Sequence, residues 1–80
     1  MKLPRDMSGG ELAKALAVFG YRSTHQTGSH LRLTTEVGGV HHITIPAHTA
    51  LKVGTLNAIL RDVADHLGLP REEVLRRLRA

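Results

Sequence analysis

The tripeptide Gly28-Ser29-His30 contains the residues best suited to carry out chemistry. Glycine and serine are common turn residues, so they predict a turn that delivers the histidine to the first position of a strand. The imidazole of histidine titrates near neutral pH and can take or give a proton. RNA cleavage needs such a group, as a base for the 2′-hydroxyl or as an acid for the leaving 5′-oxygen. His30 is therefore the candidate catalytic residue; the alternative is an ordinary exposed histidine at the start of a strand.

The same chemistry requires groups that hold the phosphate and stabilise its charged transition state. A three-residue turn over 27–29 would place Gln26 directly across from His30. Arg32 would lie two residues along on the same face, where a guanidinium suits a phosphate. Lys52, just before a predicted helix start, could add a contact, although a solvated lysine before a capped helix explains the same residues. The predicted substrate-binding residues are Gln26, Gly28, Ser29, Arg32 and Lys52.

The sequence has six histidines, and the other five suit this role less well. His42 shares the predicted outer face, but at ~3.3 Å per residue it lies about 13 Å from His30, too far to act on the same phosphate. His25 and His41 have the parity of the residues that face the helices. Adjacent strand residues point to opposite faces and no His-x-x-x-His pair occurs, so we predict neither a metal site nor a cofactor. Two others are interpreted as structural or solvated: His48 in a loop and His66 at a helix end.

Composition limits the class of protein. The 80 residues predict a single domain over 1–80 with a modest core. There are 11 Lys+Arg against 7 Asp+Glu, a net charge of +4, so a polyanion such as nucleic acid is a suitable partner. The absence of cysteine excludes a disulfide scaffold and a cysteine nucleophile. No apolar run reaches the ~20 residues that span a bilayer, and no signal-peptide pattern occurs, so we expect a cytoplasmic protein without membrane contact.

Apolar periodicity predicts the elements that position these residues. Ser8 and Glu11 form a capping box that begins a helix, and Gly20 ends it. Alternation with a period of two then predicts three short antiparallel strands: about 21–26, 30–36 and 40–46. Thr55 would cap a second helix that ends at Gly68. A last, short helix would follow, with Pro70 in its first turn.

Matching of apolar faces predicts the register of the strands. A turn over residues 37–39 pairs Leu33 with Ile43, and it pairs Leu31 with Ile45. In the first hairpin, the three-residue turn that pairs Gln26 with His30 also pairs Thr24 with Arg32. The helices would cover the apolar face. The other face would be polar and partly basic, with Arg22, Thr24, Gln26, His30, Arg32, Thr34, His42 and Thr44.

Several segments, taken in order, resemble the HicA-type toxins of toxin–antitoxin systems. Residues 1–6, 8–16 and 20–21 are similar to the start of that family. Gln26-Thr27-Gly28-Ser29-His30 resembles its Q-x-G-S-H signature. Residues 41–46, 48 and 51–56 resemble its third strand and the entry to its second helix. The resemblance covers about residues 1–67.

This resemblance implies an mRNA interferase, a toxin that cleaves RNA and stops translation, with His30 as the catalytic histidine. It implies an α+β fold like the double-stranded-RNA-binding domain, α-β-β-β-α, with helices on one face and here an extra C-terminal helix. It also implies a HicB-type antitoxin that covers the active face. His25 stands where the family commonly has arginine. Two alternatives remain: a non-catalytic RNA-binding module on the same fold, and an inactive toxin retained for antitoxin pairing.

Overall fold

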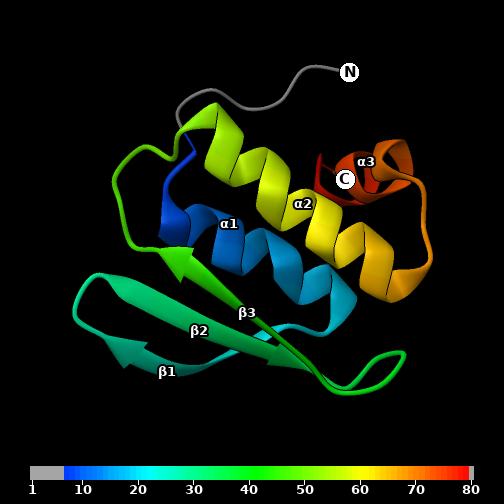
Figure 1. The fold of residues 1–80 in the computed structure, drawn as a ribbon, viewed down its shortest axis with the longest axis horizontal. Coiled ribbons are helices and arrows are strands. Elements are labelled where there is room, and N and C mark those ends of the chain that lie inside the picture. Colours follow the sequence, from blue (N-terminus) through cyan, green and yellow to red (C-terminus); the bar gives the residue numbers. More distant parts are fainter. Residues whose placement is uncertain (1–6, 80) are drawn as a thin grey trace.

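The structure, a computed structural model, describes residues 7–79, so the HicA-like segment 1–6 lies outside the described residues. The elements in order are α1 (Gly9–Ala15), the 3₁₀ helix η1 (Leu16–Phe19), β1 (Arg22–Thr27), β2 (His30–Thr35), β3 (His41–Pro46), α2 (Val53–Leu67) and α3 (Arg71–Arg79). The strands form an antiparallel sheet with the order β1-β2-β3. Figure 1 shows α1 and α2 over one face of this sheet and α3 beside α2. The predicted α+β fold is confirmed.

The core lies between the sheet and the helices (Figure 1). Its buried residues are Leu12, Leu16, Phe19, Tyr21, Leu33, Ile43, Ile45, Leu51, Leu56, Ile59, Leu60, Val63, Ala64, Val74 and Leu75. None of the helices between residues 7 and 79 has the length and apolar character that a membrane crossing requires.

The start of α1 confirms the predicted capping box. The hydroxyl of Ser8 accepts a hydrogen bond from the backbone N–H of Glu11 at 3.0 Å, and the Glu11 carboxylate accepts one from the N–H of Ser8 at 2.9 Å. Hydrogen bonding of the carboxylate to the backbone N–H of Ser8, and then to its side chain, holds the pKa of Glu11 below its usual value, because such bonds favour the charged form. The helix narrows to a 3₁₀ turn after Ala15 and ends at Gly20, whose φ is 84°. Such turns are common at helix ends.

The start of α2 differs from the prediction. The helix begins at Val53 with Lys52 as its N-cap, so the predicted cap at Thr55 is wrong. Leu51, just before the helix, is buried at 4% exposure. Burial of this side chain fixes the chain at that point, and the helix begins immediately afterwards. Its predicted end at Gly68 is confirmed.

The register between β2 and β3 is confirmed. Leu33 pairs with Ile43, and Leu31 pairs with Ile45. Three of these four side chains are buried, and Leu31 is partly buried against the core. Burial on one face fixes this register, because a slip of one residue would turn the apolar side chains toward water.

The predicted register between β1 and β2 is wrong near the turn. His30 pairs with Thr27 and Arg32 pairs with His25, not with Gln26 and Thr24. The hairpin turn contains two residues, 28–29, because His30 and Thr27 already form a pair. The register returns to the predicted one beyond an irregularity between Ser23 and His25. A β-bulge of this kind places one extra residue, here Thr24, in one strand and re-aims the side chains beside it.

Candidate active face

The turn before His30 is built by backbone conformation. Gly28 has a φ of 53°, whereas Ser29 has a negative φ, the combination that a type II′ hairpin turn uses. The carbonyl of Ser29 accepts a hydrogen bond from the N–H of Ala47 at 2.6 Å, which ties the turn to the end of β3. His30 follows as the first residue of the middle strand, so it is paired on both sides. The predicted position of His30 is therefore confirmed.

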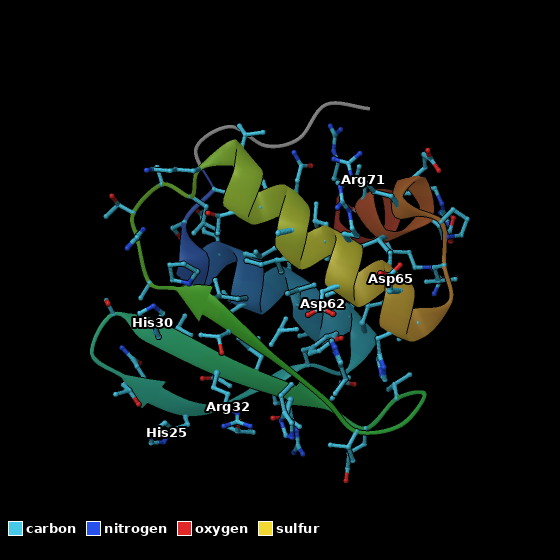
Figure 2. The ribbon with its side chains drawn as sticks, viewed as in Figure 1. His25, His30, Arg32, Asp62, Asp65 and Arg71 are labelled. Atoms are coloured by element: carbon cyan, nitrogen blue, oxygen red, sulfur yellow. The ribbon has the colours of Figure 1, made fainter. Side chains whose placement is uncertain are left out.

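We call the face of the sheet away from the helices the outer face. Near the turn before His30 it carries two adjacent rows of side chains. One row contains Thr27, His30 and Pro46. The next contains His25, Arg32 and Thr44. Figure 2 shows His25 and Arg32 on the side of the sheet opposite to the helices. Both side chains are exposed, as is His30. The rows thus present imidazole and guanidinium groups to any ligand that lies on this face.

The bulge brings His25 to the outer face and removes Gln26 from it. The prediction that His25 faces the helices is wrong, because this residue pairs with Arg32. Gln26 pairs with Leu31, whose side chain packs against the core, so Gln26 has the parity of the helix side. Sequence reasoning missed His25 because no apolar residue occurs in β1 to reveal which way its side chains point.

A chain of hydroxyl and imidazole groups crosses the outer face farther from the turn. The hydroxyl of Thr24 lies 3.1 Å from that of Thr34, which lies 2.8 Å from Nδ1 of His42. The Thr24 hydroxyl also donates to the carbonyl of Arg32 at 3.3 Å. These bonds hold the bulge against β2. His42 is therefore engaged at the opposite end of the strand from His30, as its pairing with Thr34 predicts.

Lys52, another of the predicted substrate contacts, lies on a different element from His30. Lys52 is exposed at the N-cap of α2, and no hydrogen bond or ion pair between residues 7 and 79 joins it to His30. Within the same residues, no group of three or more histidine, aspartate or glutamate side chains is arranged to hold a metal ion.

A second histidine cluster lies on the helix side of the sheet. Nδ1 of His41 lies 2.7 Å from the hydroxyl of Tyr21, and its Nε2 lies 3.3 Å from the carboxylate of Asp62. The ring stacks on that of His66 at 4.3 Å, and Nε2 of His66 donates to the carbonyl of Val37 at 2.9 Å. The cluster joins β3, α2 and the turn after β2. The parity of His41 predicted that its side chain faces the helices, but its contact with Asp62 is a tertiary contact that the strand pattern does not reveal.

Burial of Tyr21, together with the nearby charge of Asp62, raises the pKa of its hydroxyl from 10.0 to about 12. The folded chain therefore binds this proton more tightly than the unfolded chain does. Stability from this group is complete below pH 10 and is lost as the pH rises toward 12. We expect the melting temperature to fall across this window, and to fall less steeply in Tyr21→Phe. Parallel curves for the two proteins in thermal melts between pH 9 and 12 would contradict this assignment.

Comparison with known families identifies the chain. The model of the HicA toxin family of bacterial toxin–antitoxin systems matches residues 9–64. This chain belongs to the HicA toxin family. The match runs from the first residue of α1 into α2, so it includes all three strands and the outer face. As a member of the HicA family, the chain is the toxin of a toxin–antitoxin pair, with an antitoxin as its partner. Comparisons with curated proteins and with solved structures returned no significant match.

Proposed function

We propose that this HicA toxin is a metal-independent endoribonuclease that cleaves mRNA, with His30 as general acid or base. The position of His30 carries the proposal. It is exposed after a tight turn, and no side chain between residues 7 and 79 forms a hydrogen bond with its ring. Its nitrogens are thus available to a ligand on the outer face. In the proposed step the 2′-hydroxyl loses its proton and its oxygen bonds to phosphorus, while the bond between phosphorus and the 5′-oxygen breaks and the 5′-oxygen takes up a proton. His30 accepts the first proton as a base or supplies the second as an acid.

Arg32 is the proposed phosphate contact. It lies on the same strand and face as His30, about 7 Å along at ~3.3 Å per residue. A guanidinium at this distance can donate hydrogen bonds to the phosphate oxygens while His30 acts as acid or base at the ester bond of the same phosphate. Its strand neighbours are His25 and Thr44, both exposed, so nothing apolar separates the cation from a ligand in this row.

The remaining predicted contacts stand as proposals. Gly28 and Ser29 shape the turn, and their backbone lies beside His30. Lys52 would reach the RNA from the start of α2. Gln26 is exposed on the edge strand, so it would contact RNA from the sheet edge and not from across His30.

We also propose that the antitoxin is of the HicB type and covers the outer face. An inhibitor has to exclude RNA from His30 and Arg32, and these exposed side chains lie on a single face. Carboxylates on the antitoxin would complement the guanidinium, because charge-assisted hydrogen bonds are the stronger ones.

The direct test is incubation of the purified chain with a long unstructured RNA in excess EDTA. We expect cleavage at a rate that EDTA does not change, because the proposed step uses an imidazole and a guanidinium only. Cleavage that stops in EDTA and resumes with Mg²⁺ would contradict the metal-independent mechanism. Salt-dependent binding without any cleavage would support the second candidate, a non-catalytic RNA-binding module, which the exposed cations of the outer face also permit.

A further inference from the structure

A hollow lined mainly by apolar side chains lies at the far end of the molecule from His30. Its volume is about 490 Å³, within the range of pockets that hold small ligands or anchoring side chains. The residues that line it, which we call the apolar hollow, are Ala17, Val18, Phe19, Gly20, Val37, Leu67, Leu69 and Arg77. Val37 follows β2, whereas His30 begins it, so the length of the strand separates the hollow from the candidate active site.

Two of the lining side chains are more exposed than apolar side chains usually are. Val18 is 59% exposed and Val37 is 53% exposed. Both line the same hollow, and Val37 packs against Gly20, where an added Cβ atom would meet its Cγ2 at 2.7 Å. Apolar surface gathered at a hollow in this way is typical of a site that a partner covers.

The charge of the apolar hollow indicates the chemistry of that partner. Among the described lining residues, Arg77 is the one charged side chain. Its Nε donates to Glu73 at 2.8 Å, and its side chain remains 45% exposed, so its Nη groups can bind a second carboxylate. An apolar side chain next to an acidic one would complement this site. RNA would not match the apolar walls, and a second copy of this chain, with its net charge of +4, would bring charge of the same sign.

Much of the wall lies beyond the segment that the family model matches. That match ends at residue 64. Leu67 is the last residue of α2, Leu69 lies between α2 and α3, and Arg77 belongs to α3. The hollow is therefore completed by a part of this chain that the family match does not include. A contact made there can distinguish this toxin's own antitoxin from others.

We propose that the cognate antitoxin inserts a segment of adjacent apolar and acidic side chains into the apolar hollow. This contact is additional to coverage of the outer face and deepens the proposed toxin–antitoxin function, on whose antitoxin it rests. The apolar side chain would pack against Val18 and Val37, and the carboxylate would accept hydrogen bonds from Arg77. Such an anchor would strengthen the complex without touching His30.

We expect the antitoxin gene to lie beside the gene of this toxin, and the test measures the dissociation constant of its product by titration calorimetry. Val18→Asp places a carboxylate on the lip of the hollow, and Val40→Asp is the matched control. Val40 is 65% exposed but does not line the hollow. We expect Val18→Asp to weaken binding on the order of tenfold or more, and Val40→Asp to change it less than about twofold. Equal effects of the two variants, or no binding by the unaltered chain, would overturn the proposal.

A second pair of variants tests the charge. Arg77→Glu removes the lining cation, and Arg76→Glu makes the same change one residue away, at a side chain that also bonds to Glu73. Only Arg77→Glu is expected to weaken binding beyond about threefold; a matching loss in Arg76→Glu would overturn the carboxylate assignment. RNA cleavage measured on the same proteins separates the two proposals, because a chain that does not cleave RNA still reports its affinity for the antitoxin.

Discussion

His30→Ala is expected to abolish RNA cleavage while leaving the fold intact. The side chain is exposed and forms no hydrogen bond with another side chain in the part of the chain that the structure describes, so its removal changes little of the packing. Loss of a general acid or base typically lowers the rate on the order of 10²–10⁴-fold. Cleavage of a long unstructured RNA, measured beside thermal unfolding of the same sample, checks both parts of the expectation.

His42→Ala provides the matched control. His42 is also an exposed histidine on the outer face, but it pairs with Thr34 at the other end of β2. We expect this variant to keep most of its cleavage activity. If His30→Ala cleaved at nearly the unaltered rate, or if both variants lost activity alike, the assignment of the reaction to His30 would be wrong.

Gly9→Ala is expected to be strongly destabilising, on the order of 2–4 kcal/mol, because it forces a clash between two backbones. A Cβ atom at this buried first residue of α1 would lie 2.0 Å from the carbonyl oxygen of Pro46. The N–H of Gly9 also donates to the carbonyl of His48 at 3.0 Å, so the helix cannot move away without losing that bond. Urea denaturation of the variant would measure the loss.

Gly10→Ala is the control for this expectation. An added Cβ at Gly10 would meet only the Ser8 hydroxyl, at 3.9 Å, and alanine favours a helix over glycine by about 0.5–1 kcal/mol. We therefore expect Gly10→Ala to match or exceed the stability of the unaltered chain. A Gly9→Ala variant as stable as Gly10→Ala would show that the close approach of α1 to β3 does not exist in solution.

Local sequence signals predicted most of the fold because they act within one element or one apolar pair. The capping box needs only Ser8 and Glu11, and the helix end at Gly20 needs only a residue that accepts a positive φ. The register of β2 and β3 followed from apolar residues that must share a face. The start of α2 was missed because it depends on the burial of Leu51, which is a tertiary contact.

The candidate site was predicted in part for the same reason. His30 and Arg32 belong to β2, where Leu31 and Leu33 reveal which face each residue occupies. β1 is exposed throughout, so its sequence carries no such signal, and the two-residue turn with its bulge was missed. His25 was therefore placed on the wrong face. The histidine cluster beside Tyr21 depends on α2, which is distant in sequence, and only the fold brings it together.

The bulge at Thr24 lies in a strand that is exposed along its whole length. β1 begins directly after the buried Tyr21, so the core holds the chain at that end. His25 and its neighbours are exposed, so their side chains can change without any rearrangement of the core. Mutation can therefore diversify the surface beside His30 while the scaffold stays constant. A toxin built in this way can acquire a new preference for its target, and escape an old inhibitor, through substitutions that folding does not oppose.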